Sequence, residues 1–209
     1  MINPEVEELL ERLYEYEVEN NRYPTEYIID KGAEQAVTLK LAELIDGKYK
    51  LTEAGQDAGK SVVRRHRLAE KLLKDVLAVG PAHLEEDACR FEHVLLDEVD
   101  EKVCILLGHP THCPHGKPIP PGPCCQQAKN DQINEVRPLC DAKPESEGTV
   151  AYLATKDNRQ VQKLVAMGIL PGTAIKIIRQ FPSYVFQVGY SQFAVDRPLA
   201  EVIYIRWNQ

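Results

Sequence analysis

The residues best suited to chemistry in this sequence are a thiol, a carboxylate and an imidazole in one short stretch. Glu92 and His93 follow Cys89 by three and four positions, so on a helix the three side chains share one side within about 5 to 6 Å. Sulfur, oxygen and nitrogen donors together suit a first-row transition ion such as Fe(II), Mn(II) or Zn(II), and they suit neither Ca²⁺ nor Mg²⁺. The stretch therefore predicts a metal site. The alternative is a solvated carboxylate and imidazole beside a core cysteine.

Two helical runs must position these side chains. Apolar residues from Leu68 to Val76 recur at three- and four-residue spacing, which predicts an amphipathic helix with His66 and Glu70 one turn apart on another face. A second helix is predicted over residues 87–99, continuing to Leu107 before Gly108 ends it. His66 and Glu70 are a second set of possible metal ligands, which strengthens the interpretation of this region as a metal site.

These residues also carry a resemblance in their types, order and spacing. HRLAEKLL, followed further on by ACRFEH and DEV, resembles the two metal-binding helices of the diphtheria-toxin-repressor family, the iron- and manganese-dependent transcription repressors. The resemblance extends over most of the chain. It implies a homodimer in which a bound ion fixes the first helix against the metal helices, so that metal and DNA each tighten the binding of the other.

The resemblance also implies two ligand sets. The primary site would comprise Glu8, Glu11, Cys89, Glu92 and His93. The ancillary site would comprise His66, Glu70, Glu85, Asp157 and Gln160, with Glu85 where the family more usually has histidine. Cys89 favours Fe(II), whereas Glu8 and Glu11 lean towards Mn(II). Fe(II) is therefore expected, with Mn(II) as the alternative and other divalent first-row metals binding in vitro.

Composition favours a cytoplasmic protein. The 209 residues carry a formal net charge of −7, 6 cysteines and no apolar run long enough to span a membrane. The amino terminus lacks the basic start and apolar stretch of a signal peptide. In a reducing compartment the cysteines are expected to be thiols or metal ligands. The negative charge opposes nucleic-acid binding unless basic residues cluster locally.

Residues 1–60 are predicted to form a shortened winged helix-turn-helix. A helix is expected over residues 4–20, a short helical run ends near Lys31, and a helix over residues 33–45 takes the recognition position before a strand over residues 48–52. This segment is shorter than the family pattern and its exposed positions are poor in positive charge. The expected DNA-binding residues are Gln35, Thr38, Lys40, Arg64 and Arg65, although the two arginines could equally form a solvated helix face.

Residues 61–125 are expected to form the metal-binding and dimerisation domain. An apolar stripe from Leu95 to Leu107 suits the pairing of two copies, or burial within one chain. A proline-rich loop follows, whose thiols and imidazoles could hold Zn(II) or an iron–sulfur cluster. The candidate ligands of this third site are Cys113, Cys124, Cys125 and Cys140, with His109, His112 and His115 as further donors.

The rest of the chain indicates a polar linker over residues 126–147 and a small β domain over residues 148–209. Short β-rich runs with glycine and proline turns around a single helix predict a small barrel. LVAMGILPGTAIKI resembles the SH3-like barrel shared by these repressors and the small ferrous-transport accessory protein. The expected fold class is therefore α+β: a winged helix-turn-helix, a helical domain and an SH3-like β-barrel.

The resemblance implies a metal-dependent DNA-binding repressor that controls metal-ion homeostasis. Its expected partners are double-stranded operator DNA and a second copy of the chain. An enzyme is not expected, because no nucleophile, general base or phosphate loop completes a reaction centre. The alternative is a metal-binding protein that has lost operator recognition and acts through a protein partner in iron uptake.

Overall fold

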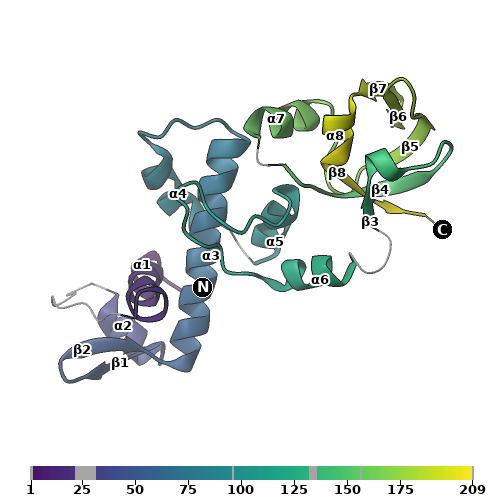
Figure 1. The fold of residues 1–209 in the computed structure, drawn as a ribbon. Helices are drawn as coiled ribbons and strands as arrows, with labels where there is room; N and C mark the ends of the chain where they lie inside the picture. The colour runs from purple at the N-terminus through teal and green to yellow at the C-terminus, as the bar shows by residue number, and fades with distance from the viewer. Residues whose placement is uncertain (1, 22–31, 96, 132–135, 156, 209) are drawn as a thin grey trace.

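The computed structural model describes residues 2–21, 32–95, 97–131, 136–155 and 157–208. The chain has a helical part and a separate C-terminal sheet, and the long helix α3 (Glu53–Asp75) runs from the amino-terminal elements to the level of the C-terminal part (Figure 1). The expected α+β class is confirmed.

The amino-terminal elements pack around one small apolar core. α1 (Pro4–Tyr14) continues into a π-helical turn (Glu15–Glu19), and α2 (Ala33–Thr38) precedes the antiparallel strands β1 (Ala42–Ile45) and β2 (Lys48–Leu51). The fully buried apolar stripe of α1 comprises Val6, Leu9, Leu10 and Leu13. The expected first helix and wing strand are therefore present, while the helical run near Lys31 lies outside the described residues.

The prediction of a single helix over residues 33–45 is wrong for the second half of this range. α2 ends at Thr38, Lys40 has a left-handed φ of 58°, and residues 42–45 form β1 instead. Asp46 and Gly47, with φ of 51° and 73°, occupy the tip of the β1–β2 hairpin. An Asp-Gly pair with both φ angles positive is a strong hairpin signal, and it takes precedence over the apolar periodicity of the flanking residues.

α3 is fixed to the hairpin at its amino-terminal end. The Thr52 hydroxyl accepts a hydrogen bond from the Gly55 N–H at 3.0 Å and so caps the helix. A Cβ added at Gly55 would lie 1.7 Å from the carbonyl oxygen of Leu41. Glycine is therefore required where α3 passes the chain leading into β1.

The single helix expected from residue 87 to Leu107 is also wrong, because the chain forms two helices. α4 (Leu84–Glu92) ends before Val94 and Leu95, and α5 (Asp97–Leu106) follows. The N–H groups of Val94 and Leu95 bond three residues back, to Phe91 and Glu92, which tightens and ends α4. Apolar residues occur on both sides of this turn, so periodicity alone did not reveal it.

The segment expected to be a linker contains regular structure. α6 (Pro123–Asp131), strand β3 (Val136–Pro138) and a 3-10 turn (Leu139–Asp141) precede the C-terminal strands. β3 pairs with the last strand, so this segment is part of the C-terminal sheet.

The C-terminal part is a six-stranded antiparallel sheet with two short helices. Its order is β3-β8-β4-β5-β6-β7. The further elements are β4 (Glu147–Leu153), α7 (Asn158–Ala166), β5 (Ala174–Arg179), β6 (Tyr184–Val188), β7 (Ser191–Val195), α8 (Arg197–Glu201) and β8 (Ile203–Trp207). Phe186, Ile203 and Ile205 are fully buried in its core. The expected helix among short strands is α7, and the short helix α8 was not expected.

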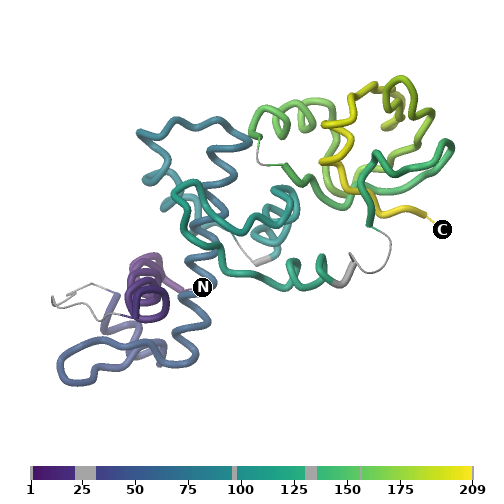
Figure 2. Tube along the Cα trace, in the orientation of Figure 1, coloured from purple at the N-terminus to yellow at the C-terminus, as the bar shows by residue number. Residues whose placement is uncertain are grey.

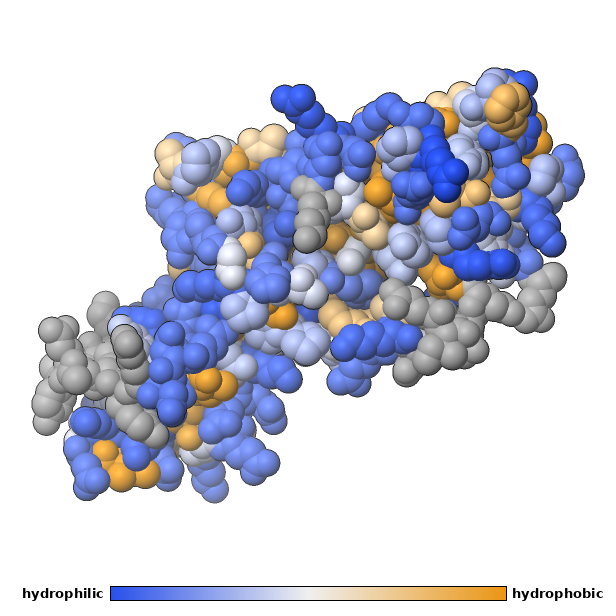
Figure 3. Space-filling model, in the orientation of Figure 1, coloured by the Kyte–Doolittle hydropathy of each residue, from blue (hydrophilic) through white to orange (hydrophobic). Residues whose placement is uncertain are grey.

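α7 lies beside the carboxyl end of α3, which brings the C-terminal part against the helical part (Figure 2). The face seen in Figure 3 is mostly hydrophilic with separate apolar patches. Among the described residues, none of the helices is long and apolar enough to cross a membrane.

Candidate metal centre

Donor side chains gather where α1, α3 and α4 pack together. α1 and α4 both contact α3 and lie on the same side of it in Figure 1. Glu8, Cys89 and His93 form the first group, with one ligand atom from each lying within 4.8 Å of the others. The Cys89 Sγ lies 4.0 Å from Glu8 Oε1. Three of the expected primary residues therefore meet, and they join α1 to α4.

Glu92 belongs to a neighbouring group, with Glu11 and His66. The Nδ1 atom of His66 lies 2.5 Å from Glu92 Oε2 and 3.7 Å from Glu11 Oε1. Glu92 is 0% exposed, and its Oε1 atom has no hydrogen-bond partner. An unpartnered buried carboxylate oxygen is costly, so a cation fits this position. The expected primary set is thus divided between two adjacent groups.

The expected ancillary residues His66, Glu70 and Glu85 form a third group. His66 Nε2 lies 3.8 Å from an oxygen of each carboxylate. Glu70 also bonds the His115 Nδ1 at 2.6 Å, in a group that includes Cys113. Five of the residues that line the adjoining cavity of about 120 Å³ are Glu15, His66, Glu70, Glu85 and His115.

The two remaining ancillary candidates are engaged locally at the start of α7. Asp157 caps the helix by accepting a hydrogen bond from the Arg159 N–H at 2.9 Å. The Gln160 Oε1 accepts a hydrogen bond from the Thr155 hydroxyl at 2.5 Å. α7 contacts α3, but these two side chains are bonded within their own segment.

Sequence reasoning missed Glu7. Its Oε1 accepts a hydrogen bond from Arg65 at 2.5 Å, and its Oε2 lies 2.6 Å from the Nδ1 of His93. Glu7 therefore joins α1 to both α3 and α4 beside the first donor group. Glu7 could have been considered because it adjoins Glu8 in an acidic helix. The resemblance, however, pointed only to Glu8 and Glu11 on this helix.

The expected third site is not brought together as proposed. Cys124 and Cys125 lie together, but Cys113 lies with Glu70. Cys140 sits in the 3-10 turn, where its Sγ is 3.6 Å from Asp141 Oδ1. His112 is exposed and bonds Thr111.

The expected DNA-binding residues divide into exposed and buried ones. Gln35, Thr38 and Lys40 are exposed at α2 and the turn after it. Arg64 is only 5% exposed, and its Nε bonds Asp100 Oδ2 at 2.8 Å. Arg65 is held by Glu7. Arg64 is therefore unable to reach DNA in this conformation, which corrects the expectation for this residue.

The buried charges shift the protonation of the donors. Burial raises the pKa of Glu11 to about 7. Burial alone would lower the pKa of His66, but the hydrogen bond to Glu92 and the charges of Glu11 and Glu70 outweigh it and raise the pKa to about 9. Burial, together with Glu92 and Glu8, raises the pKa of Cys89 to about 11. Metal binding must therefore displace protons from these groups.

Glu11 and His66 are each expected to contribute less to the stability of the metal-free protein as pH rises. The raised pKa of Glu11 makes its ionisation unfavourable in the folded state between pH 4.5 and about 7. The stabilising charge on His66 is fully present below pH 6.5 and is lost as pH passes about 9. Both groups bind more protons in the folded state, so their contribution to the free energy of unfolding falls with pH. Chemical denaturation of the wild type and of a variant that lacks one of these groups measures this contribution.

Glu11→Gln provides the control, because it removes one titrating group at nearly constant shape. Its stability should fall less with pH than that of the wild type between 4.5 and about 7. Equal pH dependence in the two proteins would contradict the assignment of a raised pKa to Glu11.

Comparison with known proteins identifies two domains. Residues 52–121 match the family model described as "Iron dependent repressor, metal binding and dimerisation domain". Residues 137–206 match the FeoA domain. Two separate segments of the chain are thus similar to an iron dependent repressor domain and to a FeoA domain. The expected resemblance is thereby confirmed.

Curated relatives include iron-dependent repressors and diphtheria toxin repressors. The iron-dependent repressor IdeR of Mycobacterium tuberculosis is 41% identical over 75 residues, which is 36% of this chain and 33% of that protein. The diphtheria toxin repressor of Corynebacterium jeikeium is 29% identical over 151 residues, 64% of this chain and 63% of that protein. The chain thus spans about a third of the first relative and under two thirds of the second.

Solved structures also align with the chain. The structure of the manganese regulator SloR aligns with 97% of this chain and 98% of its own, at 19% identity and a TM-score of 0.47. An iron uptake regulatory protein (FeoA) aligns with 35% of this chain and 97% of its own, at 32% identity and a TM-score of 0.33.

Proposed function

We propose that this iron dependent repressor homologue is a metal-dependent, DNA-binding transcriptional repressor of metal-ion homeostasis, acting in the cytoplasm as a homodimer. One observation carries the proposal. Glu8 on α1 lies with Cys89 and His93 on α4, so one ion could connect the amino-terminal elements to the helices of the iron dependent repressor domain. A metal ion can control DNA binding only if it connects the amino-terminal DNA-binding elements to the rest of the chain in this way.

The chain's own groups favour a cation at this position. Glu7, Glu8, Glu11 and Glu92 place several carboxylates around one imidazole pair, and Glu92 is fully buried with one oxygen unpartnered. Like charges in a buried position repel one another strongly. A bound divalent ion would supply the missing positive charge and coordination bonds. Without the ion, α1 is held to α3 and α4 by the contacts of Glu7 with Arg65 and His93 and by the contact of Glu11 with His66.

We assign the primary ligands as Glu8, Glu11, Cys89, Glu92 and His93. The ancillary ligands are His66, Glu70 and Glu85, with His115 facing them from the proline-rich loop. Asp157 and Gln160, at the start of the neighbouring α7, would have to exchange their local hydrogen bonds for metal coordination to join them. The sulfur of Cys89 favours Fe(II) over Mn(II) as the activating ion. Mn(II) remains the second candidate because carboxylates supply most of the other donors.

The apolar surface of α4 and α5 supports pairing of two copies. Val94 is 64% exposed and Val99 is 44% exposed, whereas Leu95, Val103 and Leu107 are buried in the core of one chain. Large exposed apolar side chains on adjacent turns are typical of a protein–protein contact.

The DNA-binding proposal rests on α2 and the hairpin, and it predicts a metal-dependent gel shift. Under anaerobic conditions, Fe(II) is expected to increase retention of the protein's own promoter region. Gln35→Ala should weaken that binding by about tenfold, since a good base contact contributes about 1 to 3 kcal/mol. Gln126→Ala, an exposed glutamine on α6, is the matched control and should bind like the wild type.

The short α2 and the burial of Arg64 leave few positively charged side chains on the described part of the proposed DNA-binding surface. The same gel shift therefore tests the alternative, a metal-binding protein that acts through a protein partner in iron uptake. Equal retention with and without Fe(II) would reject the repressor and favour that alternative.

A further inference from the structure

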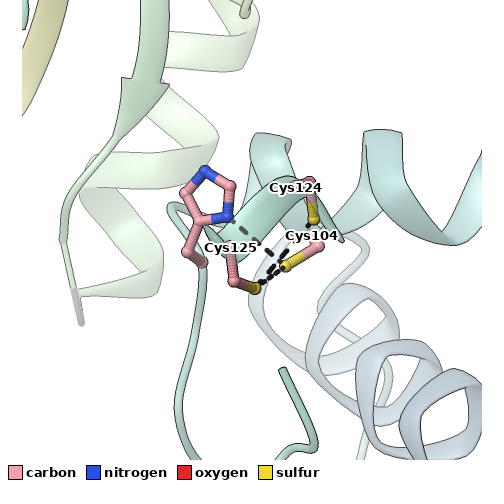
Figure 4. Close-up of side chains that lie close together, drawn as sticks. Cys104, Cys124 and Cys125 are labelled. Carbon is pink, nitrogen blue, oxygen red and sulfur yellow. Dashed lines mark hydrogen bonds between the residues drawn. The ribbon is translucent and has the colours of Figure 1, made fainter. Parts of the chain in front are cut away.

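A second set of donors lies beside α5, apart from the groups along α3. Cys104, His109, Cys124 and Cys125 each place one ligand atom within 4.8 Å of the others. The sulfur of Cys104 is 3.6 Å from that of Cys125 and 3.7 Å from His109 Nδ1, and the sulfurs of Cys124 and Cys125 are 4.0 Å apart. Figure 4 shows the three thiols pointing towards one another from two helices.

These separations match one tetrahedral ion. Zn(II) with sulfur at about 2.3 Å and nitrogen at about 2.0 Å places its ligand atoms roughly 3.5 to 3.8 Å apart. A disulfide needs sulfurs at about 2.05 Å, much closer than those observed. An iron–sulfur cluster distributes its ligands over several iron atoms, so its ligands must lie farther apart than those of a single ion.

Local structure positions each donor. Cys104 is fully buried on α5, and the chain reverses directly after that helix at Gly108 and His109, whose φ angles are 72° and 55°. This reversal returns the imidazole to Cys104. Cys124 and Cys125 follow Pro123 in the first turn of α6, where the helix dipole favours thiolates.

Arg64 on α3 contacts the cluster through Cys124. Its guanidinium is buried, with one nitrogen 3.3 Å from the sulfur of Cys124 and another 2.8 Å from the carbonyl oxygen of Pro120. A Cβ added at Gly122 would lie 2.8 Å from this guanidinium, so a larger residue there would displace the Arg64 side chain from its present position. An outer partner of this kind orients thiolate ligands and balances their charge.

The thiols of Cys104 and Cys125 lie within hydrogen-bonding distance of each other, at 3.6 Å. A thiolate is the form that binds metal.

We propose that Cys104, His109, Cys124 and Cys125 bind one structural Zn(II) ion, separate from the metal groups along α3. Four protein ligands leave no open position, which is the mark of a structural site. The ion would join α5 to α6. It would also fix the His109 ring, which packs edge-on against Tyr152 of β4 at 5.7 Å, so the site stabilises the contact between helical domain and sheet.

Zinc content measured on the full chain tests the proposal. The protein is purified without oxygen, supplied with Zn(II), and passed through a column containing citrate to remove loosely held metal. Wild type and Cys89→Ala should each retain one equivalent of Zn(II) after this column. Cys124→Ser and Cys125→Ser should each lose this equivalent. Cys140→Ser is the matched control, because this thiol lies outside the cluster, and it should retain the ion.

X-ray absorption of the zinc-loaded Cys89→Ala protein needs no change in the cluster itself. Three sulfurs and one nitrogen around zinc are expected. A shell with at most one sulfur, or equal zinc content in Cys125→Ser and Cys140→Ser, would overturn the proposal. So would a Cys104–Cys125 disulfide in the anaerobic protein, seen by mass spectrometry as the loss of two hydrogens.

Discussion

Cys89→Ala and Glu92→Ala are each expected to weaken Fe(II) binding by about 100-fold or more. Removal of an outer partner alone typically costs about 10- to 100-fold in metal affinity, and these residues are candidate ligands themselves. Cys89 supplies the sulfur beside Glu8, and Glu92 supplies a buried oxygen that accepts no hydrogen bond and lies 3.8 Å from the Nε2 of His93. Anaerobic competition with a chelating indicator measures the affinity.

Glu86→Ala is the control for both changes. Glu86 lies on the same helix but is exposed and pairs with Arg90 at 2.5 Å, so its loss should leave the Fe(II) isotherm unchanged. If Cys89→Ala and Glu92→Ala both bind Fe(II) with the same isotherm as the wild type, the assignment of the primary site is wrong.

Arg64→Ala is expected to lower the free energy of unfolding by about 3 to 5 kcal/mol, the usual cost of breaking a buried ion pair from one side. Its side chain and that of Asp100 are 6% and 9% exposed, and their atoms lie 2.8 Å apart. Loss of the guanidinium leaves the Asp100 carboxylate buried without this partner. Urea denaturation of the metal-free protein measures the effect.

Lys60→Ala is the comparison, because Lys60 lies on the same helix and is exposed. Its stability should stay within about 0.5 kcal/mol of the wild type. Equal stability of Arg64→Ala and wild type would contradict the structural role given to this arginine.

Elements with strong local signals were predictable from the sequence. The second half of α3, the wing strand β2 and the β-rich C-terminal part with the helix α7 occur where apolar spacing and turn residues placed them. The first half of α3 was not predicted, because residues 53–55 were interpreted as a turn and the domain boundary was placed at residue 60, inside this helix. The two errors in helix prediction share a cause. Residues 42–45 and the turn after Glu92 both keep apolar side chains at helical spacing, so periodicity continued across points where an Asp-Gly turn and a tightened helix end redirect the chain.

Sequence reasoning named most residues of the candidate site but only part of their grouping. Resemblance supplied Glu8, Cys89 and His93, which do meet. Spacing along one helix placed Glu92 with them, and the structure places it between two groups, with one oxygen 2.5 Å from His66 Nδ1 and the other 3.8 Å from His93 Nε2. Cys104 was missed because a single thiol in the apolar stripe of a helix is usually core filling. Its partners on α6 come from a different part of the chain, and only the packing of α5 against α6 brings them together.

Anomalous diffraction from crystals of the protein grown with Fe(II) without oxygen tests the central claim most directly. The account predicts an iron peak bonded to the Cys89 sulfur, with a carboxylate of α1 in the same coordination shell. A Cys89 thiol without iron, together with iron peaks remote from both Glu8 and His93, would contradict it.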